Sequence, residues 1–295
     1  MKLTPIQEIK CFLCGSSESK LFDRRFFRGE LITNRICRAC GFVYQSPRMS
    51  PTQLEEFYAN EYRRLYQGDD GPVQKDFAVQ KARAANLLEF TRSQGVNHLG
   101  RHLDIGSSIG YMLKTFMQSY HTEAVGVEPG LAFQETTLLA GLRIYSQLKD
   151  MSHQDEASFD LISFVHVLEH LPDPVRTLQT IRKEWVAPDG YLLIEVPNLY
   201  CHDCFEIAHL ASFSQHSLQQ ILKKSGFKVT AEKLHGTPHS KILPLYITVL
   251  AQPASLENPE KKVEVVLETA VKIKRYWGFL KRKAIERLLP REAWV

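Results

Sequence analysis

A turn rich in small residues carries the first sign of chemistry in this sequence. Residues 103–110 read Leu-Asp-Ile-Gly-Ser-Ser-Ile-Gly, and a helical pattern follows over residues 111–117. Gly106 can adopt backbone angles that a side chain forbids, and Gly110 allows close packing or the close approach of a ligand. The first amide groups of the helix point at whatever occupies the turn. We therefore expect a cradle for a nucleotide-like ligand, with a plain strand-to-helix turn as the alternative.

An acidic residue makes ligand binding the better explanation of this turn. A short apolar segment at residues 124–127 ends at Glu128, which lies 24 residues after Asp104. At about this separation a βαβ unit places an acid on the hydroxyl groups of an adenosine ribose. Chance produces such a pair much less often than either feature alone, so the sequence favours nucleotide binding.

Two Cys-x-x-Cys-Gly motifs near the start of the chain point to a metal site. Short strands are expected between them, at residues 20–27 and 30–36, joined by Arg28-Gly29. Four thiolates at this spacing suit a tetrahedral Zn²⁺ ion, with a disulfide or redox pair as the alternative. Because so small a segment cannot bury a sufficient core, the metal would supply its stability. The expected ligands are Cys11, Cys14, Cys37 and Cys40.

Strands and helices alternate after residue 73, which predicts an α/β fold with a doubly wound, mostly parallel sheet. The predicted strands lie at residues 102–105, 124–127, 142–145, 159–165 and 191–196, followed by antiparallel edge strands at 228–234 and 245–251. The predicted helices lie at residues 73–94, 111–117, 131–140, 174–186 and 217–225. A turn is expected at Pro188-Asp189-Gly190.

The chain is expected to divide into four parts. These are a zinc ribbon at residues 1–50, a linker or lid at 51–72, the α/β domain at 73–253 and a basic amphipathic helix at 254–295. The linker carries Tyr58, Tyr62 and Tyr66, which could cover a site or pack between domains. The C-terminal helix, with an interruption expected near Gly278, would dock on its own domain or a second subunit, and an anionic membrane surface is the alternative.

Composition and charge exclude other classes of protein. The hydrophobic content of 44% and charged content of 24% are typical of a soluble globular protein. No apolar run approaches the roughly 20 residues of a membrane span, and residues 1–10 lack the apolar core of a signal peptide, so we expect a cytoplasmic protein. Residues 259–295 hold ten Lys or Arg against five Glu and account for the net charge of +4. The body is therefore not expected to bind nucleic acid.

Taken together, these motifs resemble the class I S-adenosylmethionine-dependent methyltransferases. The resemblance rests on residues 103–110, 126–129, 166–174 and 188–198, and it covers about residues 73–253. It implies that the turn lies along the methionine and ribose of S-adenosylmethionine, that Glu128 binds the ribose hydroxyl groups, and that the end of the fourth strand borders the methionine. The implied cofactor-binding residues are Asp104, Gly106, Ser107, Ser108, Gly110, Glu128, Val165 and His166.

Two features of the resemblance bear on specificity. Ser108 stands where the family usually has glycine, and residues 148–151 show no evident pair for the adenine. The ribbon is similar to the zinc-binding module that precedes many bacterial methyltransferases acting on sugars, surface glycans or secondary metabolites. This likeness implies a small-molecule acceptor, of sugar or glycan-precursor type, that is methylated on oxygen or carbon.

Histidines are the candidates for proton removal from the acceptor. Methyl transfer is an in-line displacement at a sulfonium carbon, so the enzyme aligns the acceptor and removes a proton when the acceptor is a hydroxyl. A side chain with a pKa near neutral suits that role. Among His166, His170 and His209, we expect His170 and His209 to be catalytic; the alternative is that each is a hydrogen-bonded histidine of a loop or helix.

Other interpretations use the same residues. Residues 166–170 spell His-x-x-Glu-His, an inverted metalloprotease signature, but Pro172 and Pro174 leave no room for the long helix that such a site needs. A divalent ion held by His166, Glu169 and His170 in a methyltransferase stays open.

Two further alternatives concern the function of the whole chain, and one concerns the cysteines of a loop. A nicotinamide-dependent oxidoreductase would want glycine at Ser108 and glycine or alanine at Ile109. A zinc-ribbon interaction protein with an inactive methyltransferase scaffold is the alternative from a different class, and the intact Glu128 argues against it. Cys201 and Cys204 could bind a metal or form a redox bridge, but unpartnered cysteines are expected.

Overall fold

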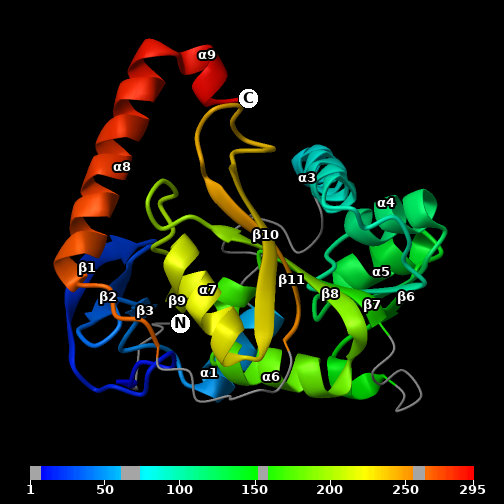
Figure 1. Ribbon diagram of the computed structural model, residues 1–295, viewed down its shortest axis with the longest axis horizontal. Coiled ribbons are helices and arrows are strands. Elements are labelled where there is room, and N and C mark those ends of the chain that lie inside the picture. The colour runs from blue at the N-terminus through cyan, green and yellow to red at the C-terminus, as the bar shows by residue number, and fades with distance from the viewer. Residues whose placement is uncertain (1–7, 61–73, 152–158, 255–262) are drawn as a thin grey trace.

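The computed structural model describes residues 8–60, 74–151, 159–254 and 263–295, and its centre is one seven-stranded sheet (Figure 1). The strands lie in the order β10-β11-β8-β7-β4-β5-β6. Strands β4 to β8 run parallel, whereas β11 is antiparallel to both of its neighbours. The strands are β4 Arg101–Ile105, β5 Glu123–Val127, β6 Arg143–Tyr145, β7 Phe159–Val165, β8 Val186–Pro197, β10 Phe227–His235 and β11 Tyr246–Pro253. The predicted α/β fold with a mostly parallel sheet and antiparallel edge strands is confirmed.

Helices cover both faces of the sheet because alternate side chains of each strand point to opposite sides. On β8, Leu193 packs with α3 and α4, whereas Leu192 and Ile194 pack with α6 and α7. Leu161 and Ile162 on β7 divide in the same way. The helices are α3 Gln74–Ser93, α4 Tyr111–Tyr120, α5 Leu131–Leu139, α6 Pro174–Glu184 and α7 Gln215–Lys224, with short 3-10 turns at Leu148–Asp150 and Leu168–His170.

The predicted turn at residues 188–190 is wrong, because β8 runs without interruption from Val186 to Pro197. Along β7 the pairing advances from Phe159 to Leu161, while along β8 it advances from Val186 to Tyr191. The additional residues of β8 therefore form a bulge. Pro188, Asp189 and Gly190 lie in this bulge, so residues typical of a turn occur here without ending the strand.

The ribbon forms a second sheet, which is joined to the α/β domain by strand pairing. Its strands are β1 Ser19–Phe27, β2 Glu30–Cys37 and β3 Val43–Gln45, as expected for two strands between the cysteine pairs, and β3 pairs with β9 Ala211–Ser212. Phe42 and Tyr44 share a hydrophobic core with Phe213 and with Leu218 on α7. Helix α1, Pro51–Asn60, begins the predicted linker. The remainder of that linker, with Tyr62 and Tyr66, lies outside the described residues.

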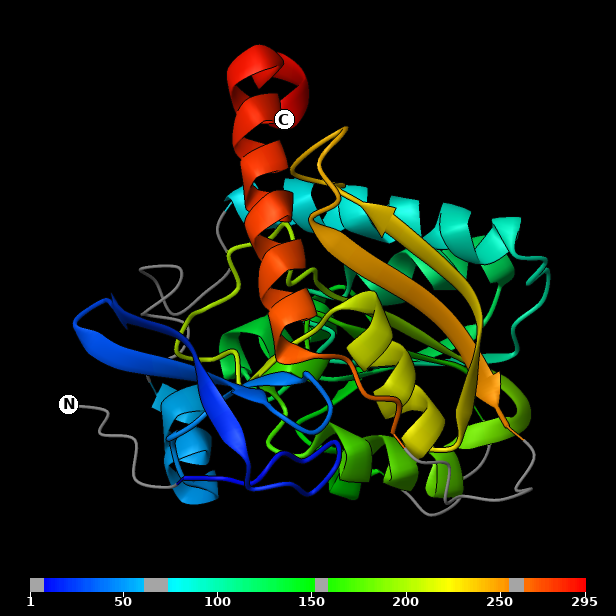
Figure 2. The ribbon, with the colours of Figure 1, turned by 60° about the vertical axis from the view of Figure 1, so that its left-hand side comes forward.

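The C-terminal helix α8, Glu268–Leu288, lies along the side of the molecule from the ribbon to the β10–β11 loop (Figures 1 and 2). At one end Lys20 on β1 forms an ion pair with Glu268. Beyond the other end, α9, Pro290–Ala293, leads to Val295, whose amide donates to the carbonyl of His239. The helix therefore docks on its own chain.

The expected interruption near Gly278 is wrong, since α8 continues through this residue. A Cβ atom at Gly278 would lie 2.0 Å from the carbonyl oxygen of Tyr200, so glycine is needed there to let the helix approach the loop after β8. None of the described helices is long and apolar enough to cross a membrane.

Candidate active site

The small-residue turn after β4 is held tightly against β5. The amides of Gly106 and Ser107 both donate to the carbonyl of Val127, at 2.8 and 3.1 Å. Gly106, Ser108 and Gly110 have positive φ angles of 75°, 49° and 75°. A Cβ atom at Gly106 would lie 2.3 Å from Cγ2 of Val167, so the glycine also brings this turn against the segment after β7.

Ser108 adopts a backbone conformation that favours glycine, and contacts on both sides hold it there. Its hydroxyl accepts a hydrogen bond from Nε2 of Gln80 at 2.7 Å, and its carbonyl accepts one from the hydroxyl of Thr137 at 3.0 Å. The serine at this position is therefore compatible with the turn that the sequence predicts.

Glu128 lies at the end of β5 with its carboxylate fixed beside the turn. One oxygen accepts the amide of Ser108 at 3.0 Å, and the other accepts the amide of Gly130 at 2.9 Å. A carboxylate oxygen can accept more than one hydrogen bond, so these contacts are compatible with further donors such as ribose hydroxyl groups. The acceptor oxygens of Glu128 and the narrow turn fit the nucleoside part of S-adenosylmethionine.

Asp104 points into the sheet toward β7. It accepts a hydrogen bond of 2.6 Å from the hydroxyl of Ser163, which in turn lies 2.8 Å from Nε2 of His102. Burial raises the pKa of Asp104 to about 7, against the lowering effect of Ser163, and the charge of Glu128 raises it further. Burial lowers the pKa of His102 to about 3, so this histidine is neutral near pH 7.

A buried carboxylate on β8 organises the region beyond the turn. Glu195 is fully buried and lies 2.8 Å from Nε of Arg83 and 3.1 Å from Nε2 of both His166 and His235. The hydroxyl of Thr248 donates to it at 3.2 Å. Burial alone would raise the pKa of Glu195, but His166, His235 and Arg83 outweigh it and hold the pKa well below its ordinary range.

Tyr246, at the start of β11, is surrounded by histidines from four segments. The ring of His166 lies 5.0 Å from its ring centroid, and its hydroxyl lies 2.7 Å from Nδ1 of His239. His202 and His235 also contact the ring, at 5.6 and 5.7 Å between centroids. Burial, with further shifts from nearby charges, lowers the pKa of His202 to about 3. His202 is therefore neutral near pH 7, and it and the Tyr246 hydroxyl could offer uncharged hydrogen-bonding groups to an acceptor.

The structure brings the two predicted catalytic histidines together. The ring centroids of His170 and His209 lie 4.8 Å apart, and both rings lie near Glu169. β7 ends at Val165, His166 follows it directly, and Nδ1 of His166 lies 3.3 Å from the Glu169 carboxylate. Burial lowers the pKa of His170 to about 4, so its imidazole is neutral near pH 7.

Sequence patterns did not indicate the residues around Glu195 and Tyr246. The one available signal was a carboxylate in an otherwise apolar strand, since a buried acid needs partners. Its partners come from α3, the end of β7, β10 and β11. Such a set is assembled only by the folded sheet.

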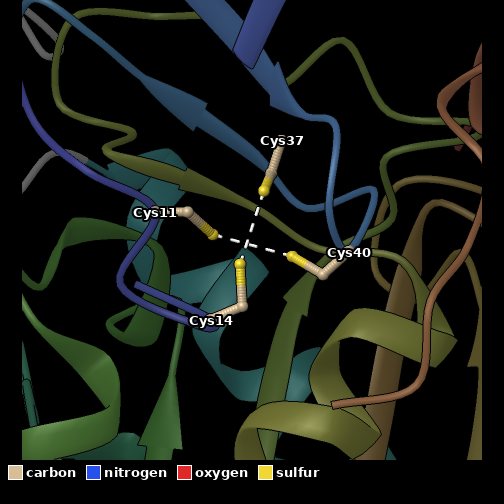
Figure 3. Close-up of side chains that lie close together, drawn as sticks. All are labelled: Cys11, Cys14, Cys37 and Cys40. Carbon is tan, nitrogen blue, oxygen red and sulfur yellow. Dashed lines mark hydrogen bonds between the residues drawn. The ribbon is translucent and has the colours of Figure 1, made fainter. Parts of the chain in front are cut away.

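The four cysteines of the ribbon point toward one centre (Figure 3). Sγ atoms of Cys11 and Cys40 lie 3.6 Å apart, and those of Cys14 and Cys37 lie 3.4 Å apart. These separations exceed the roughly 2.05 Å of a disulfide and approach the edge of about 3.8 Å that a ZnS₄ tetrahedron with bonds of about 2.3 Å would have. The donor set and its geometry therefore fit a closed, structural zinc site.

Cys201 and Cys204, by contrast, contribute to separate hydrophobic clusters. Cys201 packs with Leu243 and Leu245, whereas Cys204 packs with Phe205 and Val271. Both are free thiols, and burial raises the pKa of Cys201 to about 11 and raises that of Cys204 as well. They pack as small apolar side chains, as expected for unpartnered cysteines.

Comparison with known proteins agrees with the fold described above. The model of one protein family, described as a methyltransferase domain, matches residues 78–232. The Burkholderia thailandensis 1,6-didemethyltoxoflavin-N1-methyltransferase, solved with 1,6-didemethyltoxoflavin and S-adenosylhomocysteine bound, is 15% identical, with a TM-score of 0.57 over 79% of this chain and 100% of that chain. A Leishmania major S-adenosylmethionine-dependent methyltransferase is 18% identical, with a TM-score of 0.51 over 68% and 82%. None of the curated proteins matches the chain.

Proposed function

The chain belongs to the methyltransferase domain family, and we propose that it transfers a methyl group from S-adenosylmethionine to a small molecule of sugar or glycan-precursor type. The observation that carries the proposal is the position of Glu128, whose carboxylate is fixed beside the turn by the amides of Ser108 and Gly130. The finer assignment of the acceptor rests on the side chains beyond the turn.

Glu128 and the turn would hold the cofactor. When bound, S-adenosylmethionine supplies an electrophilic methyl group on a sulfonium sulfur. Glu128 would accept hydrogen bonds from the ribose hydroxyl groups, and Gly106 and Gly110 would let the backbone approach the nucleoside. Because Gly106 lies close to Val167, the methionine end would lie toward His166 and the segment that follows it.

The acceptor would lie against the histidines beyond β7 and β8. Tyr246, His202 and His239 offer hydrogen-bonding groups without a fixed charge, which suits an acceptor with several hydroxyl groups. The Burkholderia relative also binds a small-molecule acceptor, 1,6-didemethyltoxoflavin. The ribbon resembles modules found before methyltransferases that act on sugars, surface glycans or secondary metabolites, and a sugar-type acceptor is compatible with this resemblance.

His170 and His209 remain the proposed catalytic residues. Nδ1 of His170 lies 3.0 Å from the carbonyl of Ala208, and Nδ1 of His209 lies 3.0 Å from that of Cys204. Each Nδ1 therefore carries its proton and donates it, so that Nε2 is the atom by which either ring would act on an acceptor hydroxyl. Peripheral membrane contact through α8 and assembly into oligomers stay predictions.

The acceptor class is tested by product analysis. The purified protein is incubated with methyl-labelled S-adenosylmethionine and a panel of nucleotide sugars, and the products are examined by mass spectrometry. We expect one acceptor to gain a single labelled methyl group, and the Glu128→Ala variant to form no product above background. Absence of transfer to every sugar-type acceptor would contradict the acceptor class. Failure to bind S-adenosylmethionine at all would favour the inactive-scaffold alternative.

A further inference from the structure

Three donor side chains meet behind the end of β7. Glu169, His170 and His209 each present one ligand atom, and these atoms all lie within 4.8 Å of one another. Glu169 and His209 are buried, with exposed fractions of 1% and 7%. The amide of Leu210 donates to the carbonyl of Glu169 at 2.8 Å, which ties the two contributing segments together. The site is therefore built into the fold.

The carboxylate of Glu169 shares its ion-pair partner, His166, with Glu195. No described residue donates a hydrogen bond to either of its oxygens, and its ion-pair contact in the described part of the chain is Nδ1 of His166 at 3.3 Å. A buried carboxylate without hydrogen bonds is costly unless a charge compensates it. Glu195, by contrast, has three ion-pair contacts, and Thr248 and one of these partners, His166, also form hydrogen bonds with it. Glu195 is therefore well paired within the described protein, whereas the carboxylate of Glu169 accepts no hydrogen bond from it.

Both histidine rings are held in the way that metal ligands are held. A ligating histidine commonly donates its second ring N–H to a backbone carbonyl, which fixes the tautomer and aims the other nitrogen at the metal. The Nδ1 contacts of His170 with Ala208 and of His209 with Cys204 supply this arrangement. With Nδ1 used in this way, Nε2 is the ring nitrogen that would coordinate a cation, and in His209 this atom lies 3.5 Å from a carboxylate oxygen of Glu206.

We propose that Glu169, His170 and His209 bind one divalent first-row transition-metal ion, and that this ion coordinates a hydroxyl oxygen of the acceptor. Two imidazoles and one carboxylate leave coordination positions open, which is typical of reactive metal sites, whereas the four cysteines of the ribbon form a closed site. The set differs from the sequence alternative of His166, Glu169 and His170, because His166 turns its Nε2 to Glu195 instead.

The position of this metal site suits the proposed methyl transfer. The role of the ion toward the acceptor rests on that proposed function. Val167, which touches Gly106 in the cofactor turn, lies two residues before Glu169. With Nε2 of both rings on the ion, His170 and His209 act as ligands in place of the proton acceptors described above. The coordinated hydroxyl is more acidic than a free one, so it loses its proton to solvent more readily. As the O–CH₃ bond forms, the S–CH₃ bond breaks and its electron pair stays on sulfur. The sulfonium becomes a neutral thioether, and the proton lost from the hydroxyl balances the charge.

Manganese provides a probe that separates this site from the ribbon, because thiolate sites select zinc whereas nitrogen and oxygen donors accept Mn²⁺. The full-length protein, with its ribbon zinc in place, is titrated with Mn²⁺ and the free ion is followed by electron paramagnetic resonance. We expect one Mn²⁺ per chain. Glu169→Gln keeps the side-chain volume, and it should weaken Mn²⁺ binding more than tenfold, since changes outside the ligands already cost about 10–100-fold.

The control is His216→Gln, which changes a half-buried histidine on α7 that contacts the carbonyl of Glu264. It should bind Mn²⁺ as the wild-type protein does, and His209→Gln should bind it as weakly as Glu169→Gln. Circular dichroism confirms that each variant is folded, and a variant that is not folded is replaced by His170→Gln.

Two outcomes would overturn the inference. One is a wild-type protein that binds neither Mn²⁺ nor Co²⁺ beyond its ribbon metal. The other is a folded Glu169→Gln variant with unchanged Mn²⁺ affinity. Calorimetric titration of S-adenosylmethionine into the same samples separates this failure from failure of the proposed function, because the cofactor should bind whether or not the ion is present.

Discussion

Replacement of Glu195 by Gln should destabilise the protein strongly. The substitution keeps the shape of the side chain but removes a fully buried charge that lies 2.8 Å from Arg83 and 3.1 Å from His166 and His235. Loss of one partner from a buried ion pair costs about 3–5 kcal/mol, because the remaining charge is left uncompensated. For a protein of this size, each kcal/mol lowers Tm by roughly 2–4 °C, so a decrease of about 6–20 °C is expected.

Thermal and urea unfolding of the wild type and Glu195→Gln measure this effect. Glu123→Gln is the matched control, because Glu123 also contacts two arginines, Arg101 at 3.2 Å and Arg143 at 3.3 Å, but its side chain is 51% exposed. Solvent screening limits such a pair to about 1 kcal/mol or less. A Glu195→Gln variant as stable as Glu123→Gln would refute the reasoning, since it would show that the buried charge is not compensated by these partners.

The same carboxylate gives the protein a defined acid sensitivity. Its pKa in the folded protein lies below the ordinary value of 4.5, because its cationic partners outweigh burial. The group therefore contributes stability above about pH 4.5, and this contribution is lost as the pH falls below that value. Stability of the wild type should fall more steeply than that of Glu195→Gln between pH 4.5 and lower values.

Three further predictions concern the ribbon, α8 and the turn. Cys40→Ser should abolish the one equivalent of zinc measured by elemental analysis and lower Tm, because the ion stabilises the ribbon; retained zinc would contradict the four-sulfur site. Gly278→Ala should destabilise the protein and expose α8 to proteolysis, because its Cβ would meet Tyr200; stabilisation of about 1 kcal/mol, as in a free helix, would mean that α8 does not dock there. Ser108→Gly should change S-adenosylmethionine affinity less than fivefold, since relief of a left-handed backbone offsets the lost Gln80 bond; a tenfold loss would give the hydroxyl a direct role.

The sequence predicted what local patterns encode. The two Cys-x-x-Cys-Gly motifs define the sulfur cluster, and the period of apolar residues defines the strands and helices of the sheet. The turn after β4 and Glu128 were also predicted, because a turn followed by an acid at the end of the next strand is a property of one βαβ unit. These features depend on contacts between residues that are close in sequence.

Features that depend on distant contacts were missed or mistaken. Gly278 was predicted to interrupt a helix, whereas its role is a close approach to Tyr200, far away in sequence. Likewise, the bulge at residues 188–190 depends on the pairing of β8 with β7. The meeting of His209 with Glu169 and His170 depends on the path of the loop before β9, which no periodicity encodes.

Calorimetric titration of S-adenosylmethionine into the wild type, Glu128→Gln and Glu128→Ala tests the central claim most directly. We predict that the wild type binds one cofactor per chain and that Glu128→Ala binds it at least tenfold more weakly, because hydrogen bonds to a charged group contribute about 1.5–3 kcal/mol each. Glu128→Gln, which keeps one acceptor oxygen, should lie between them. A folded Glu128→Ala variant with unchanged affinity would contradict the assignment of Glu128 to the ribose.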